Sequence, residues 1–112
     1  MILGAEALQD WARALLAAAG LEDEAAATVA ETLVATSLRG VDSHGVARLP
    51  IYVERLRAGV LNGRPRPRVE RRDGAVAVVD ADGGPGQVAG LFATDLSIEL
   101  AREHGIGAVS VH

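Results

Sequence analysis

The sequence predicts an α+β fold, in which an N-terminal helical hairpin and a third helix precede a hairpin and strand-helix-strand unit that starts a larger mixed sheet. Apolar residues recur at helical spacing in the first half of the chain. Short runs rich in β-branched residues flank one further helical pattern in the second half. We therefore divide the 112 residues into an N-terminal helical region (1–59), an Arg- and Pro-rich connector (60–74) and an incomplete strand-helix-strand portion (75–112).

Two helices are expected to form the hairpin. The first covers residues 5–19, and Gly20 follows it at the place where a left-handed cap is favoured. The second covers residues 22–38, with acidic residues in its first turn, where the helix dipole favours them, and Gly40 beyond its end. The inward faces comprise Leu8, Trp11, Leu15 and Ala19 in the first helix and Val29, Leu33 and Ser37 in the second.

A third helix and then the connector are expected next. The helix covers residues 49–58, because Pro50 is tolerated only in a first turn and Gly59 can end it. Residues 60–74 alternate Arg and Pro, which disfavours a helix and favours an extended backbone in solvent. The arginines of this connector lack neighbouring aromatic residues, so we interpret them as solvated rather than as a nucleic-acid surface.

A strand-helix-strand unit is expected after Asp73-Gly74, a dipeptide typical of a hairpin turn. The first strand covers residues 75–80, the helix residues 87–103, and the second strand the apolar run 106–112, which suits burial on both faces. The buried helix face comprises Ala89, Phe92 or Ala93, Leu96 and Leu100, with Gly105 as its end. Because two parallel strands need further strands and covering helices, we expect the chain to be a fragment of a larger protein.

The composition restricts the class of protein. A net charge of −4, with one residue each of Trp, Tyr and Phe, argues against nucleic acid and anionic lipid as partners. No apolar run approaches the ~18 residues that span a bilayer, and the N-terminus lacks the pattern of a signal peptide. The lack of cysteine excludes disulfides and thiolate metal sites. We therefore expect a cytoplasmic protein without a nucleic-acid, membrane or metal partner.

His44 is the leading candidate for chemistry, because it lies in Asp42-Ser43-His44-Gly45 at a loop-to-helix junction. An imidazole can exchange a proton near neutral pH, as hydride transfer between a carbonyl and an alcohol requires. Arg48 follows four residues later, so in a helix the two side chains would share a face, and its guanidinium could grip a carboxylate. The structural alternative is that Asp42 and Ser43 cap backbone N–H groups and that the His-Arg pair is an ordinary surface feature.

Other motifs favour structural interpretations. Ser43 and His44 are unsuited to a serine hydrolase pair, because adjacent side chains diverge and no G-x-S-x-G elbow surrounds them. The acidic and glycine-rich segment 80–86 matches neither a calcium loop nor a phosphate loop, so we expect a tight turn between strand and helix. His104 can complement a helix dipole, and we assign no catalytic role to His112.

Two long segments resemble the malate/L-lactate dehydrogenase family, which is distinct from the Rossmann-fold lactate and malate dehydrogenases. They are GVDSHGVARLPIYVERLRAG (40–59) and DADGGPGQVAGLFATDLSIELAREHGIGAVSV (80–111). The resemblance implies an oxidoreductase that uses NAD or NADP to oxidise small 2-hydroxy acids such as malate or L-lactate, or to reduce 2-oxo acids or cyclic imino acids. It also implies a homodimer when full length.

The resemblance implies roles for individual residues. His44 takes the position of a catalytic proton donor or acceptor, and Ser43 that of the residue that assists or orients it. Arg48 takes the position of a contact to a substrate or cofactor anion. The residues that line the same cofactor region are Leu49, Pro50, Ile51 and Tyr52. Since family members extend well beyond these segments, we expect the 112 residues alone to be inactive, and the alternative is a noncatalytic helical association module.

Overall fold

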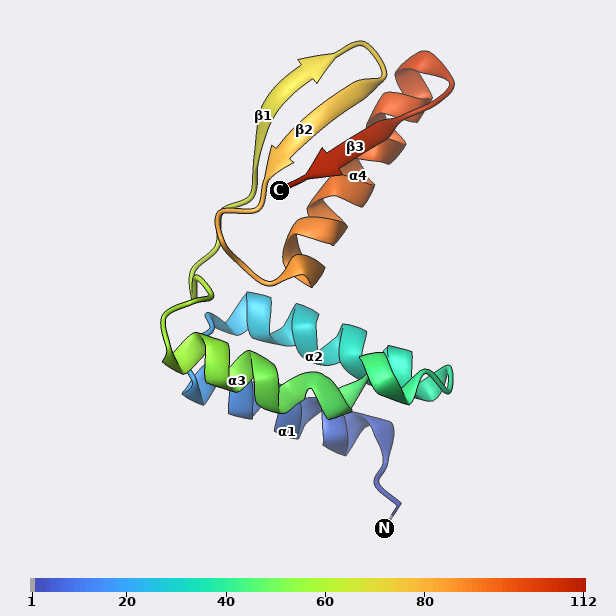
Figure 1. The fold of residues 1–112 in the computed structure, drawn as a ribbon. Coiled ribbons are helices and arrows are strands. Elements are labelled where there is room, and N and C mark those ends of the chain that lie inside the picture. Colours follow the sequence, from blue (N-terminus) through green and yellow to red (C-terminus); the bar gives the residue numbers. More distant parts are fainter. Residues whose placement is uncertain (1) are drawn as a thin grey trace. The chain divides into compact units, whose positions relative to one another are not determined.

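The computed structural model describes residues 2–112, which form two compact units divided between Arg64 and Pro65 (Figure 1). The first unit contains α1 (Ala5–Ala18), α2 (Asp23–Leu38), the 3-10 helices η1 (Asp42–His44) and η2 (Val46–Arg48), and α3 (Leu49–Arg57). The second unit contains β1 (Arg68–Asp73), β2 (Val76–Asp80), α4 (Gly86–His104) and β3 (Ala108–Val111). These elements confirm the predicted α+β class.

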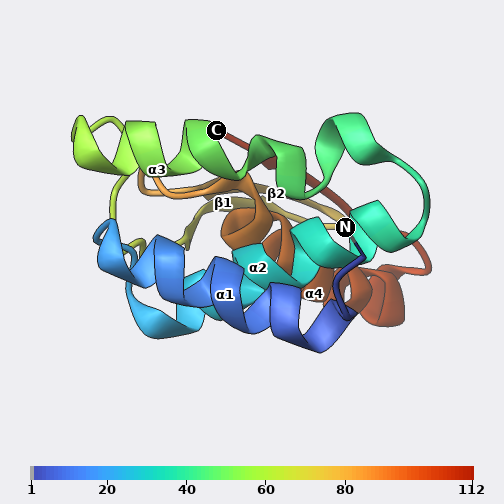
Figure 2. The same cartoon turned by 90° about the horizontal axis from the view of Figure 1, so that it is seen from below.

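Helices α1 and α2 pack against each other as the predicted hairpin, and α3 contacts α1 (Figure 2). Val29 and Leu33 of α2 are buried, as their spacing predicted. Pro50 lies in the first turn of α3, where its missing N–H costs nothing. The buried apolar residues of this unit are Ala12, Leu16, Leu21, Ala25, Ala26, Val29, Ala30, Leu33, Val34, Leu49 and Leu56.

The predicted apolar face of α1 is displaced by one residue. Ala12 and Leu16 are fully buried, whereas Leu8 and Leu15 are only half-buried. Trp11 is 57% exposed. The buried faces of α1 and α2 are rich in alanine, which allows close packing and leaves no room for an indole between the two helices. The sequence pattern identified the helix correctly but overestimated the burial of its largest side chain.

Strand β1 lies within the segment that the sequence predicts as a connector. Residues 68–73 are extended and exposed, as expected, but they also pair antiparallel with β2. The two-residue turn Gly74-Ala75, directly after Asp73, joins the two strands and confirms the predicted hairpin. All six side chains of β1 are exposed, so the strand carries no alternating apolar pattern that a reader of the sequence could recognise. Backbone pairing with β2 therefore determines this strand.

The sheet has the order β1-β2-β3, and α4 connects the parallel strands β2 and β3, which confirms the strand-helix-strand unit. One face of β2 packs against α4. On α4, Ala93 rather than Phe92 takes the buried position, because the Phe92 side chain is 36% exposed. Gly105 ends α4 in the left-handed conformation (φ +82°). The core residues of this unit are Ala77, Val79, Leu96 and Leu100, with Val109 packed against them.

Strand β3 is less buried than its apolar sequence predicts. Ala108, Ser110 and Val111 are exposed, and Val109 is half-buried. Within the second unit, α4 covers one face of the sheet and β2 pairs with one edge of β3. No element among residues 65–112 covers the other face, in keeping with the expectation that these parallel strands need further strands and helices to bury both faces.

Two arginines of β1 form ion pairs with neighbouring elements of the second unit. The guanidinium of Arg72 donates to Glu99 at 3.1 Å and to Glu103 at 2.7 Å, and so joins β1 to α4. Arg68 forms an ion pair with Asp80 of β2. Since both contacts lie within the second unit, they tie an exposed edge strand to its neighbours. The interpretation of the connector arginines as merely solvated is wrong for these two residues.

The segment between β2 and α4 forms the predicted tight turn. The N–H of Asp82 donates to the Asp80 carboxylate at 2.7 Å, and this bond, together with Arg68, holds the pKa of Asp80 below its ordinary value. Asp82 adopts a left-handed conformation (φ +56°), which Asp tolerates better than most residues. Its carboxylate accepts the N–H of Arg66 at 2.9 Å. Residues 2–112 contain no cluster of three His, Asp or Glu side chains that could hold a metal ion.

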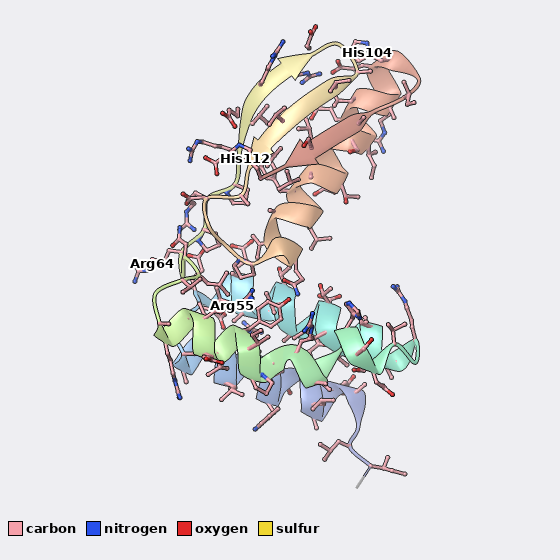
Figure 3. The ribbon with its side chains drawn as sticks, in the orientation of Figure 1. Arg55, Arg64, His104 and His112 are labelled. Carbon is pink, nitrogen blue, oxygen red and sulfur yellow. The ribbon has the colours of Figure 1, made fainter. Side chains whose placement is uncertain are left out.

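His112 closes the end of the sheet, and His104 ends α4 (Figure 3). The N–H of His112 donates to the carbonyl of Val79 at 3.1 Å, and its ring forms an ion pair with Glu70 of β1. The hydrogen bond to Glu70 is the main cause that raises the pKa of His112, and the charge of Asp80 adds to it. The ring of His112 therefore connects β3 to β1 across the central strand.

None of the helices among residues 2–112 is long and apolar enough to cross a membrane.

We expect Leu16→Ala to lower the free energy of unfolding by about 2–5 kcal/mol, because it removes buried methyl groups and leaves a cavity. Trp11→Ala removes a larger side chain, but we expect a smaller loss of about 1–2 kcal/mol because more than half of the indole surface is in solvent. Urea unfolding followed by circular dichroism measures both losses. A greater loss for Trp11→Ala would contradict the burial pattern of α1.

We expect Glu70→Gln to lower the pKa of His112 towards the ordinary histidine value of about 6.5. The pair with Glu70 raises this pKa in the folded chain, so its stabilising effect is complete below the unfolded-state pKa and is lost as the pH rises through the folded-state pKa. An NMR titration of the imidazole C–H signals of His112 measures the change. An unchanged His112 titration in Glu70→Gln would show that the pair does not form.

Candidate functional site

The segment of residues 42–48 links α2 to α3 through two short 3-10 helices, with Asp42, Ser43 and His44 in the first of them. The N–H of Gly45 donates to the carbonyl of Asp42 at 3.3 Å, and the N–H of Arg48 donates to the carbonyl of Gly45 at 3.0 Å. Ser43 and His44 are exposed, whereas Gly45 is buried. The segment therefore presents its polar side chains to solvent while its backbone is fixed by local hydrogen bonds.

Ser43 and His44 form a side-chain pair that the sequence argument judged unfavourable. Ser43 Oγ lies 2.8 Å from His44 Nδ1, within hydrogen-bond distance. Both residues lie in the 3-10 helix η1, and the expectation that their adjacent side chains diverge is wrong for this pair. Neither Asp42 nor Ser43 is a helix N-cap, because both lie inside η1, whose N-cap is Val41. The bond orients the imidazole, and Nε2 is the ring nitrogen that remains to meet a ligand.

His44 and Arg48 do not lie on one continuous helix. The backbone of Gly45, between η1 and η2, has φ −93° and ψ −144°, which is far from helical geometry. The rule that residues four apart share a helix face therefore does not apply to this pair. The placement of Arg48 relative to His44 depends on how the peptide after Gly45 is held.

The residues after Arg48 differ in what they present. Arg48 is exposed, and its backbone forms the N-cap of α3. Leu49 is only 2% exposed, so its side chain belongs to the core of the first unit. Pro50 is exposed, and Ile51 and Tyr52 are half-buried. A surface ligand could therefore contact the side chains of Arg48, Pro50, Ile51 and Tyr52, whereas Leu49 fixes the start of the helix.

Ser37 is a polar partner of this segment that the sequence argument missed. Its spacing placed it on the inward face of α2, and the structure shows its hydroxyl accepting the N–H of Val46 at 3.0 Å. The signal in the sequence was the serine itself, since a hydroxyl on an otherwise apolar face needs a hydrogen-bond partner. The partner lies nine residues later and could not be identified from helical spacing.

The comparison with family models matches residues 3–112 to the family described as malate/L-lactate dehydrogenase. Among curated proteins, the chain is similar to a malate dehydrogenase of Pyrococcus abyssi, with 45% identity over 92 residues that cover 82% of this chain and 25% of that protein. It is also similar to the ureidoglycolate dehydrogenase (NAD(+)) of Escherichia coli K12, with 37% identity over 111 residues that cover 99% of this chain and 32% of that protein.

Solved structures agree with this match. The malate dehydrogenase from Pyrococcus horikoshii OT3 superposes with a TM-score of 0.93 at 38% identity, covering 99% of this chain and 32% of that one. The delta1-piperideine-2-carboxylate reductase from Pseudomonas syringae superposes with a TM-score of 0.90 at 30% identity, covering 100% of this chain and 34% of that one. The chain thus spans between a quarter and about a third of the length of these relatives.

We expect Ser43→Ala to change the balance of the two neutral tautomers of His44, because it removes the hydroxyl next to Nδ1. Long-range ¹⁵N–¹H NMR spectra of the imidazole measure the tautomer populations directly. Ser110→Ala, which removes an exposed hydroxyl from β3, is the matched control and should leave the His44 signals in place. Identical His44 spectra in wild type and Ser43→Ala would mean that the pair does not orient the ring.

Proposed function

The chain belongs to the malate/L-lactate dehydrogenase family, and from this premise we propose that the full-length protein is an NAD(P)-dependent oxidoreductase of small 2-hydroxy acids, 2-oxo acids or cyclic imino acids. The observation that carries the proposal is the exposed hydrogen bond between Ser43 and His44, with the exposed cation Arg48 four residues after His44. This arrangement offers a proton-exchanging ring and an anion-binding group on one surface segment. Both are needed to reduce the oxo group of a carboxylic acid.

The names of the relatives support the class of substrate. They include dehydrogenases of malate, ureidoglycolate and L-sulfolactate, and a reductase of piperideine-2-carboxylate. All four compounds are carboxylic acids, although the groups beyond the carboxylate differ. Each of these substrates therefore offers a carboxylate, which an exposed arginine can bind with two parallel hydrogen bonds. The proposal leaves the substrate's side chain open.

The proposal assigns roles toward the substrate to His44, Ser43 and Arg48. His44 Nε2 gives a proton to the substrate oxygen or nitrogen when the oxo or imino group is reduced, and takes it back in the oxidation. Ser43 keeps the ring oriented through Nδ1, so that Nε2 faces the substrate. Arg48 binds the substrate carboxylate, which holds the reacting carbon at a fixed distance from the imidazole.

NAD or NADP supplies or accepts the hydride when it is bound. The side chains suited to hold part of it are Arg48, whose charge complements phosphate, and the neighbouring Pro50, Ile51 and Tyr52. Leu49 would contribute only through its backbone, because its side chain is buried. The E. coli relative is named for NAD(+), and the choice between the two cofactors stays open in this proposal.

We propose further that the full-length protein is a cytoplasmic homodimer, and that residues 1–59, 60–74 and 75–112 serve as helical region, connector and the start of the nucleotide/substrate domain. Exposed apolar side chains support an assembly. Leu3 and Trp11 are both more than half exposed and line a shallow apolar hollow with Ala7 and Leu8. The same hollow favours the second candidate, a noncatalytic association module, which predicts assembly without turnover.

We expect His44→Asn to lower kcat by about 10²- to 10⁴-fold, because it removes the proton donor. Arg48→Lys should mainly raise KM for the acid, because an ammonium cannot form the two parallel hydrogen bonds of a guanidinium. Steady-state kinetics of a version as long as the relatives, with several oxo and imino acids, measures both effects.

The matched controls are His104→Asn and Arg57→Lys, which change exposed residues outside the segment. Both controls should retain wild-type kcat/KM. If His44→Asn and Arg48→Lys retain it as well, the assigned roles are wrong. If the wild type dimerises but turns over none of these acids with NAD or NADP, the association module is the better description.

A further inference from the structure

We propose that Ser37 is a positioning residue of the His44/Arg48 site, and that its hydroxyl fixes the junction between the two 3-10 helices that present these side chains. This inference rests on the proposed function, since it names a residue that would control the geometry of that same site. Ser37 lies in the last turn of α2, outside the segment itself.

The hydroxyl of Ser37 forms a different kind of hydrogen bond from the hydroxyls of three threonines in α2 and α4. Thr32, Thr36 and Thr94 each donate to the carbonyl four residues earlier in their own helix, at 2.8 Å. Ser37 instead accepts the N–H of Val46, nine residues ahead, at 3.0 Å. Its hydroxyl therefore bonds to the functional segment, whereas the threonine hydroxyls satisfy their own helices.

Gly45 shows how closely the segment rests on this hydroxyl. A Cβ atom built on Gly45 would lie 2.0 Å from Ser37 Oγ and 3.0 Å from Ser37 Cβ. The φ of Gly45 is negative, so the space, and not the backbone conformation, requires glycine here. Gly45 is buried against α2, although the two polar residues that precede it, Ser43 and His44, are exposed. Contact and hydrogen bond thus hold the same peptide from one side.

The peptide between Gly45 and Val46 lies between the two 3-10 helices, so the hydrogen bond to Ser37 affects how these helices are oriented. His44 ends η1, and Val46 begins η2, which ends at Arg48. The N–H that Ser37 accepts belongs to the one junction where the helical geometry is interrupted. If that bond is removed, the peptide between Gly45 and Val46 can rotate, and Arg48 moves relative to His44. A displacement of about 1 Å between groups that hold one substrate can reduce the rate by about 100-fold.

The test compares Ser37→Ala with Thr36→Val in a version as long as the relatives. Thr36 provides a matched control, because its hydroxyl lies in the same turn but bonds to Thr32. We expect Ser37→Ala to lower kcat/KM for the oxo acid by about 10- to 100-fold and Thr36→Val to leave it within about twofold. The neutral tautomer populations of His44 should persist in Ser37→Ala, because the bond to Ser43 remains.

A double-mutant cycle separates positioning from a general loss of stability. If Ser37 acts by placing Arg48, its substitution should cost much less in an Arg48→Ala background. Equal losses in both backgrounds would overturn the proposal. So would wild-type kinetics of Ser37→Ala in a folded protein.

A measurement without catalysis distinguishes this proposal from the proposed function. Ser37→Ala should speed hydrogen exchange of the Val46 amide and shift the backbone signals of Gly45, whereas Thr36→Val should change neither. If the wild type has no dehydrogenase activity but these NMR changes appear, the proposed function fails while the structural role of Ser37 stands. If the Val46 amide is unaffected by Ser37→Ala, the positioning proposal fails whatever the activity of the enzyme.

Discussion

The contact between Ser37 and Gly45 is the constraint on which the arrangement of the candidate site depends. A side chain at position 45 would collide with the Ser37 hydroxyl, and the next N–H uses that hydroxyl as its acceptor. Because α2 is held by its buried face, the last turn of this helix is a rigid support for the exposed segment. The packed core of the first unit thereby holds in place the exposed side chains of Ser43, His44 and Arg48.

Local patterns predicted the elements that bury an apolar face. The helices α2 and α4 and the strand β2 have regular spacing of Leu, Val and Ala, and each is buried where its spacing indicates. Trp11 shows the limit of this reasoning, since the pattern cannot tell that two alanine-rich helices approach too closely for an indole. β1 shows another limit, because a strand whose side chains are all exposed is specified by the backbone of its partner.

The sequence suggested which residues to consider for the candidate site, but not how they are arranged. His44, Ser43 and Arg48 could be selected by the chemistry of their side chains and by the resemblance of the surrounding segment. Their mutual placement could not, because the assumption of one helix fails at Gly45. The hydroxyl that holds the backbone after Gly45 belongs to Ser37 on α2. No rule based on sequence spacing connects Ser37 to Val46. Long-range contacts of single polar atoms are the information that a sequence pattern lacks.

The exposed character of β1 has a consequence for how the second unit would lose its structure. This strand is held by backbone hydrogen bonds, by the pairs of Arg72 with Glu99 and Glu103, and by the pairs of Arg68 and Glu70 with their partners. Solvent-exposed ion pairs are weakened by salt, whereas the apolar contact between β2 and α4 is not. Strand β1 would therefore separate from the sheet first as the ionic strength rises. Strands β2 and β3 and helix α4 would remain together longer.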